Sequence, residues 1–270
     1  MADFIESYRG AVKAWECDSF GHFTVAYYFE RFSEASIAML AGLRARGLLL
    51  EGEDWRSASF VARFQEELRA GDGLHILTTV AEQSAERLRF EHRLVNSVSG
   101  ATATTVEETL SPRVPGAAPE EGVAAQPGEG FMVGSLDVVR AAELDEHGEL
   151  SLGGYVHRSS AASAQLLGAA GITPEYLRAN QRGFATFEIR LELCEPRPRA
   201  GARLRVESAL ARLGSSSLQM LHRMCELPSG RLAASGSQSG AHFDLATRRS
   251  IPIPQELRER AAAYLVGERD

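Results

Sequence analysis

The stretch that decides the fold runs from Trp15 to Ala35 and reads WECDSFGHFTVAYYFERFSEA. An apolar segment precedes it, and a polar turn with a glycine carries Asp18. Apolar residues then recur at the spacing of a helix, and Thr24 stands where the N-cap of that helix is expected. The stretch therefore predicts a short strand over residues 8–15, an acidic turn, and a long helix over residues 26–46.

The same stretch recurs 127 residues further along the chain. Without a gap, 8 of the 21 positions from 16 to 36 are identical to their counterparts, far more than unrelated stretches share. The chain is therefore predicted to be a tandem duplication, with a second strand over residues 136–142 and a second helix over 153–170. The identical residues are Glu16, Asp18, Gly21, Tyr28, Arg31, Ser33, Ala35 and Ser36, which match Glu143, Asp145, Gly148, Tyr155, Arg158, Ser160, Ala162 and Ser163.

A segment rich in proline and glycine separates the two repeats. Residues 111–130 hold four of the ten prolines and show no hydrophobic period, which is typical of a linker. We therefore expect a first domain over residues 1–110, a flexible linker over 111–130 and a second domain over 131–270.

Segments that alternate apolar and polar residues follow each predicted helix, as antiparallel strands do. One long helix against such strands predicts an α+β architecture for each repeat. A last helix is predicted over residues 255–266. The predicted strands cover residues 57–68, 74–83, 87–97 and 101–109 in the first repeat and 183–195, 203–212, 216–226 and 232–243 in the second.

The composition argues against several classes of partner and site. The chain of 270 residues has a net charge of −7, so we expect no nucleic-acid partner. Lys13 is its only lysine, so arginine carries almost all of the positive charge. Apolar runs are too short to cross a membrane, and the first residues do not form a secretory signal, so we expect a cytoplasmic protein. Three widely spaced cysteines and seven scattered histidines predict neither a disulfide framework nor a metal site.

Residues 15–35 resemble the hotdog-fold thioesterases of the 4-hydroxybenzoyl-CoA thioesterase type. Their signature is an acidic turn, D-C-D-x-x-G-H-V-N-N, followed by a helix, A-x-Y-x-x-x-F-E-E-A. The chain departs from it at Thr24 and Val25, which replace two asparagines, and in the second repeat at Glu149 and Ala161, which replace a histidine and a glutamate. The matching residues are Glu16, Cys17, Asp18, Gly21, His22, Ala26, Tyr28, Phe32, Glu34 and Ala35.

The resemblance implies two tandem hotdog domains that form a pseudo-dimer, and hydrolysis of acyl-CoA or acyl-carrier-protein thioesters without a cofactor. It assigns the aspartate to nucleophilic attack or to activation of water, and the N-terminus of the following helix to the oxyanion. Catalytic roles then go to Asp18 and Asp145. Substrate-binding roles go to His22, Thr24, Val25, Tyr28, Glu34, Ser151, Leu152 and Tyr155.

Other interpretations stay open at this point. Asp18 and His22 could order the turn, Tyr28 and Tyr155 could pack in the core, and Glu34 could pair with Arg31. The same fold serves hydratases and dehydratases of acyl thioesters, and the departures from the signature also fit a non-catalytic protein that binds acyl thioesters. A homo-oligomer of pseudo-dimers is a further open point. Four arginines could hold phosphates or form a solvated strand edge: Arg197, Arg199, Arg203 and Arg205.

Overall fold

The computed structural model describes residues 3–18, 20–50, 53–113 and 128–266. The chain divides into two compact units, residues 1–117 with 151–156 and residues 118–150 with 157–270. Ser111 and Pro112, which the sequence analysis assigns to the linker, end a strand of the first unit. Residues 114–127 of the predicted linker lie outside the described residues.

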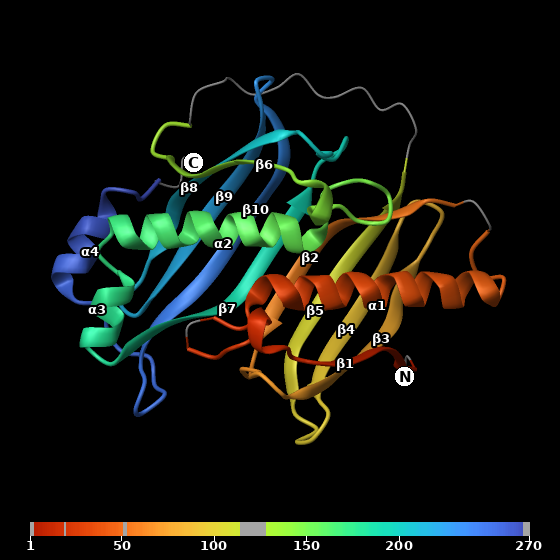
Figure 1. The fold of residues 1–270 in the computed structure, drawn as a ribbon, viewed down its shortest axis with the longest axis horizontal. Helices are drawn as coiled ribbons and strands as arrows, with labels where there is room; N and C mark the ends of the chain where they lie inside the picture. The colour runs from red at the N-terminus through yellow and green to blue at the C-terminus, as the bar shows by residue number, and fades with distance from the viewer. Residues whose placement is uncertain (1–2, 19, 51–52, 114–127, 267–270) are drawn as a thin grey trace. The chain divides into compact units, whose positions relative to one another are not determined.

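The first unit is one long helix across an antiparallel sheet (Figure 1). The strands lie in the order β1-β3-β4-β5-β2, and every neighbouring pair is antiparallel. The elements are β1 (Ile5–Ala11), α1 (Val25–Ala45), β2 (Trp55–Phe64), β3 (Gly73–Gln83), β4 (Leu88–Asn96) and β5 (Thr102–Pro112).

Helix α1 is held to its sheet by the apolar stripe that the sequence pattern predicts. Phe29, Phe32 and Ala35 are fully buried on this stripe. Burial of each large side chain of this kind stabilises the fold by about 1.5–3 kcal/mol. The last two turns of the helix contribute to a core cluster with the strands beneath it, made of Met39, Leu40, Leu43, Leu49, Trp55, Leu88, Phe90 and Leu110.

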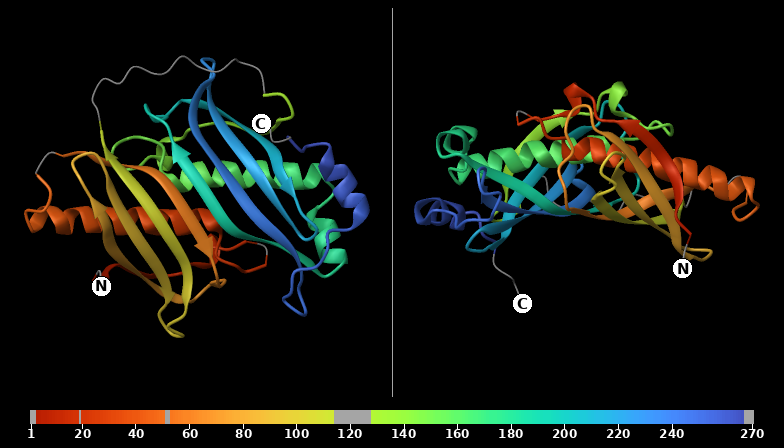
Figure 2. Two further views of the ribbon diagram at one scale, coloured as in Figure 1. Left: turned by 180° about the vertical axis from the view of Figure 1, so that it is seen from behind. Right: turned by 90° about the horizontal axis from the view of Figure 1, so that it is seen from below.

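The second unit repeats this plan with two extra helices (Figure 2). Its strands lie in the order β6-β8-β9-β10-β7, again antiparallel throughout. Gly134 of the first strand lies so close to the long helix that a Cβ there would meet the Cα of Ala162 at 2.7 Å. The elements are β6 (Met132–Val138), α2 (Leu152–Ala169), α3 (Pro174–Ala179), β7 (Arg182–Leu193), β8 (Arg203–Leu213), β9 (Ser217–Leu227), β10 (Arg231–Asp244) and α4 (Gln255–Ala262).

Three predicted boundaries are corrected. The strands expected over 8–15 and 136–142 end earlier, at Ala11 and Val138, because a 3₁₀ turn follows each of them. The last helix ends at Ala262 instead of residue 266, since the chain then pairs with β8 through Val266 N–H and Leu210 O, 2.9 Å apart. Helix α3 is not predicted from the sequence, because its six residues are too few to show a helical period.

A row of polar side chains crosses the sheet beneath each long helix. In the first unit, Glu108 accepts hydrogen bonds from Ser36 and Ser57, and its Oε2 lies 3.0 Å from Nε2 of His92. The other ring nitrogen of His92 lies 2.8 Å from Thr78 Oγ1. Because Glu108 and His92 are almost wholly buried, this network satisfies polar groups that would otherwise be costly in the core.

The second unit repeats the row with one change of charge. Ser163 Oγ donates to Gln238 Oε1 at 2.9 Å and lies 3.2 Å from Nε2 of His222. Ser208 Oγ lies 2.7 Å from the other ring nitrogen, Nδ1. Gln238 therefore replaces the carboxylate of Glu108, and burial lowers the pKa of His222 to about 4.

Candidate active site

The acidic turn of the first repeat is closed by its own aspartate. Asp18 Oδ1 accepts hydrogen bonds from the backbone N–H groups of Phe20 and His22, at 2.8 and 3.0 Å. The backbone N–H of Asp18 donates to the His22 carbonyl at 2.8 Å, and Gly21 supplies the positive φ that the turn requires. The carboxylate is therefore a turn former, as one alternative proposed, yet its side chain is still 44% exposed.

The second repeat builds the same turn around Asp145. Its Oδ1 accepts from the N–H groups of His147 and Glu149, at 2.9 and 3.0 Å. Its backbone N–H donates to the Glu149 carbonyl at 2.8 Å, and Gly148 has a φ of +70°. The two aspartates thus have the same local geometry, and the duplication extends to individual hydrogen bonds.

A glutamate and an arginine join each turn to the long helix that follows it. Arg31 pairs with Glu16, which also accepts from the Lys13 N–H at 2.8 Å. In the second repeat, Arg158 Nη1 lies 3.2 Å from Glu143 Oε1. Burial raises the pKa of Glu143, but the hydrogen bonds from Arg140 and Arg158 outweigh burial and hold that pKa at about 2.

The start of α1 offers free backbone donors next to the first turn. The Thr24 N–H donates to Glu16 O at 2.9 Å, which places the turn beside the first residue of the helix. Thr24 is the N-cap residue, as expected, but within the described chain its side chain accepts no capping bond. The N–H groups of Val25 and Ala26 find no acceptor among the described residues, so they can bind an anion or a developing oxyanion.

The start of α2 has a side-chain cap, which the start of α1 lacks within the described chain. Ser151 Oγ accepts from the Gly154 N–H at 3.2 Å, and its carbonyl accepts from Tyr155. Ser151 therefore acts as the N-cap of α2. The matching donor of the first repeat, the Tyr27 N–H, is bonded to Thr24 O at 3.0 Å instead.

His22 lies between groups of opposite charge. Its Nε2 is 3.2 Å from Glu67 Oε2 and 3.0 Å from Arg69 Nη2. The same nitrogen can donate to the glutamate or accept from the arginine, but not both at once. Its Nδ1 faces Asp18 Oδ2 at 4.0 Å, beyond hydrogen-bond distance, so His22 is a polar neighbour of the aspartate rather than its bonded partner.

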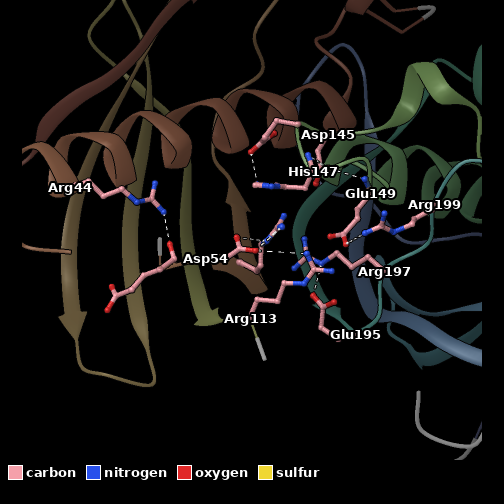
Figure 3. Close-up of polar contacts among 12 residues, drawn as sticks. Arg44, Asp54, Arg113, Asp145, His147, Glu149, Glu195, Arg197 and Arg199 are labelled. Carbon is pink, nitrogen blue, oxygen red and sulfur yellow. Dashed lines mark hydrogen bonds and ion pairs between the residues drawn. The ribbon is translucent and has the colours of Figure 1, made fainter. Parts of the chain in front are cut away.

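At the position of His22, the second repeat has Glu149, which is buried and pairs with Arg199 Nη2 at 3.1 Å (Figure 3). The figure also shows Arg197 beside Glu195, at 3.0 Å. Arg205 lies 2.6 Å from Glu207. Three of the four arginines that the sequence offered as phosphate ligands are therefore paired with carboxylates.

Sequence reasoning missed Glu67, Arg69 and the pairing of Arg199. These residues lie 45 or more positions from the turns they contact, so no local motif indicates them. A signal existed in the repeat: Glu67 to Arg69 align with Arg197 to Arg199 at an offset of 130, three more than in the turns.

The remaining predicted residues lie in the core or in surface ion pairs. Tyr28 is buried between Phe23 and Phe64, with ring centroids 4.4 and 5.4 Å away, and burial raises the pKa of its hydroxyl. Tyr155 and Leu152 are also buried. These placements favour the packing interpretation of the two tyrosines.

Glu34 pairs with Arg31 on the helix surface at 2.9 Å, the second of the alternatives considered for it. The first turn therefore brings together a fixed carboxylate, a histidine and open helix donors. Such groups can polarise a carbonyl and activate water. Within the described ranges, no group of three or more His, Cys, Asp or Glu side chains is placed to hold a metal ion, and no helix is long and apolar enough to span a membrane.

Comparison of the coordinates with solved structures shows the same fold in thioesterases of low sequence identity. A provisionally assigned oleoyl thioesterase from Lactobacillus plantarum has a TM-score of 0.65 at 11% identity, covering 93% of this chain and 98% of that chain. An acyl-ACP thioesterase from Bacteroides thetaiotaomicron has a TM-score of 0.62 at 8% identity, covering 86% and 96%. The 12:0-ACP thioesterase from Umbellularia californica has a TM-score of 0.63 at 11% identity, covering 89% and 94%.

Comparison of the sequence with curated proteins finds no significant match. The family model described as the thioesterase-like superfamily matches residues 12–112 and again residues 139–261. The two matched segments coincide with the two repeats. The chain therefore belongs to the thioesterase-like superfamily, with a hotdog fold in two repeated segments.

Proposed function

We propose that this protein hydrolyses acyl thioesters and that the turn of Asp18 carries the reaction. The observation that carries the proposal is the fixed, partly exposed carboxylate of Asp18 beside helix donors that no described residue occupies. Membership of the thioesterase-like superfamily supports the reaction class.

The groups of the first turn fit each step of hydrolysis. The Asp18 carboxylate either attacks the thioester carbonyl carbon or takes a proton from the water that attacks it. The N–H groups of Val25 and Ala26 stabilise the negative oxygen that forms. The C–S bond then breaks, the thiol leaves with a proton, and the acyl group leaves as a carboxylic acid once water has added.

The first repeat is the better candidate for two reasons. The side-chain oxygen of Ser151 lies over the first turn of α2, where it caps the Gly154 N–H, whereas the side chain of Thr24 makes no capping bond with any described residue at the start of α1. In addition, the first repeat has the imidazole of His22, which can donate a hydrogen bond, at the position where the second repeat has the buried carboxylate of Glu149, which can only accept one when ionised.

The substrate is an acyl group on coenzyme A or on a carrier protein. The similar structures from Bacteroides thetaiotaomicron and Umbellularia californica are named as acyl-carrier-protein thioesterases, and one from Mycobacterium marinum as an acyl-CoA thioesterase, with a TM-score of 0.55. Pairing of the repeats as a pseudo-dimer and assembly of further copies stay predictions from the family resemblance.

The reaction is tested with a panel of acyl-CoA and acyl-carrier-protein thioesters, measuring free thiol and free acid together. Hydrolysis predicts equal amounts of both. A change in enoyl absorbance without thiol would identify a hydratase or dehydratase instead. Tight binding of every thioester tested, with neither product, would identify a non-catalytic binding protein.

A further inference from the structure

Two exposed aromatic side chains of the first turn, Trp15 and Phe20, have no Trp, Phe or Tyr at the matching positions of the second repeat. Trp15 is 76% exposed and Phe20 is 40% exposed. Phe20 also lies in a stacked arrangement on the ring of His22, with centroids 6.4 Å apart. The corresponding residues of the second repeat are Ala142 and His147. An indole left in water has a large apolar face for a planar ligand to cover.

The two turns also differ in whether their neighbouring cations are paired with carboxylates. In the second repeat, Arg140 and Arg199 are engaged by Glu143 and Glu149. Their counterparts in the first repeat are Lys13 and Arg69.

Lys13 forms no ion pair with any described residue, and the guanidinium of Arg69 contacts His22 but no carboxylate of the described chain. Both side chains are exposed. In a protein of net charge −7, these two cations are free to meet an anion.

Trp15 lies on the 3₁₀ turn Ala14–Glu16, and Glu16 O accepts the N–H of Thr24 at the start of α1. Lys13 immediately precedes this turn. Arg69 reaches the same turn through His22, with which it also forms a backbone bridge. The exposed indole and the two cations therefore rim one small region, the one that holds Asp18.

From these four differences we propose that the rim of the first turn, formed by Lys13, Trp15, Phe20 and Arg69, binds the adenine nucleotide of a coenzyme A thioester. The inference rests on the proposed hydrolysis and specifies its substrate class. Adenine stacks on the indole of Trp15, while the phosphates meet Lys13 and Arg69. A carrier protein presents no free base to stack, so the rim favours coenzyme A delivery.

Trp15 fluorescence gives a direct test of binding. The sequence has two tryptophans, and the other, Trp55, is only 5% exposed and lies in the core. Titration of Trp55→Phe with coenzyme A is expected to quench the remaining emission saturably. Trp15→Ala is expected to raise the Kd for coenzyme A about tenfold, measured by calorimetry, and Lys13→Gln a few-fold, more at low salt. Val98→Ala, at an exposed apolar residue of the β4–β5 hairpin, is the control and is expected to leave Kd unchanged.

Kinetics then separate this inference from the proposed hydrolysis. For Trp15→Ala, kcat/KM is expected to fall about tenfold with acyl-CoA and to stay constant with the acyl N-acetylcysteamine thioester, which lacks the nucleotide. Equal losses with both substrates would overturn the inference. A fall in kcat/KM confined to acyl-carrier-protein substrates would also overturn it. A change of oligomeric state without a change in the Kd for coenzyme A would do the same, because both results would mean that the rim binds a protein. Quenching and weakened binding without any hydrolysis would instead support the inference and refute the proposed function.

Discussion

Arg158 Nη1 lies 3.2 Å from Glu143 Oε1, and this ion pair ties the acidic turn of the second repeat to the helix that follows it. Arg31 and Glu16 make the matching pair in the first repeat. Both residues are identical between the repeats because they hold the turn that carries the aspartate. Two identities 15 positions apart in each repeat thus correspond to the same ion pair between turn and helix.

This pair predicts a difference between two arginines that share one carboxylate. Arg158 is 4% exposed and also bonds Asp137 through Nε at 2.7 Å, whereas Arg140 is 78% exposed. We expect Arg158→Gln to lower the free energy of unfolding by about 2 kcal/mol, because it removes the buried partner of Glu143 and the arginine that bonds Asp137. Arg140→Gln should cost below about 1 kcal/mol. Urea denaturation measures both, and equal costs would contradict the role given to Arg158.

The buried polar row of the first unit can be tested with a substitution that the second repeat already contains. Glu108→Gln places in the first unit the residue found at Gln238, which bonds Ser163 and Thr186. We expect this change to cost below about 1 kcal/mol. Glu108→Leu, similar in size, leaves Ser36, Ser57 and His92 without their acceptor and should cost about 3 kcal/mol more. If chemical denaturation finds both variants equally unstable, the charge of Glu108 matters more than its hydrogen bonds.

His222 predicts a loss of stability in mild acid. Burial lowers its pKa from 6.5 to about 4. Between these values the unfolded chain binds a proton that the folded protein does not, so stability falls as the pH drops from 6.5 towards 4 and is unaffected by this group above that range. The loss reaches about 3 kcal/mol. Denaturation at several pH values should show a shallower slope for His222→Gln; an unchanged slope would rule out this residue as a main cause.

The two helix caps predict losses of stability of different size when Ser151 and Thr24 are replaced. Ser151→Ala removes the acceptor of the Gly154 N–H and should destabilise the protein by about 1 kcal/mol. Thr24→Ala removes no capping bond of the described chain and should cost less. Thermal unfolding of the two variants side by side gives the comparison. A larger cost for Thr24→Ala would mean that its side chain does cap α1 in solution.

The sequence predicts the long helices and most strands to within a few residues, because apolar periodicity determines which face is buried. Asp18 and Thr24, the N-cap of α1, could be predicted because the turn and the helix are contiguous in the sequence. Tyr28 shows the limit of such reasoning: the sequence allowed a substrate contact or packing in the core, and its ring lies between Phe23 and Phe64. Burial of a single tyrosine depends on strands far away in the sequence.

Contacts across the sheet could not be predicted either, because they join residues that are far apart in the sequence. Glu67 and Arg69 meet His22 only because β2 ends beside the turn, and nothing near His22 in the sequence indicates this. His92 and Glu108 looked like ordinary strand residues, since alternation shows which face a residue occupies but not its partner on the next strand. The repeat itself was the most useful guide, and an offset allowed to vary would have extended it to the sheets.

The most direct test of the central claim is the rate of thiol release from one acyl-CoA by wild type, Asp18→Asn and Asp145→Asn. Asparagine keeps the Oδ1 acceptor that closes each turn, so circular dichroism should show all three proteins folded. We predict that Asp18→Asn lowers kcat at least a hundredfold, since the carboxamide of asparagine neither attacks the carbonyl nor takes a proton. We predict that Asp145→Asn retains most of the activity. Full activity in folded Asp18→Asn would contradict the account.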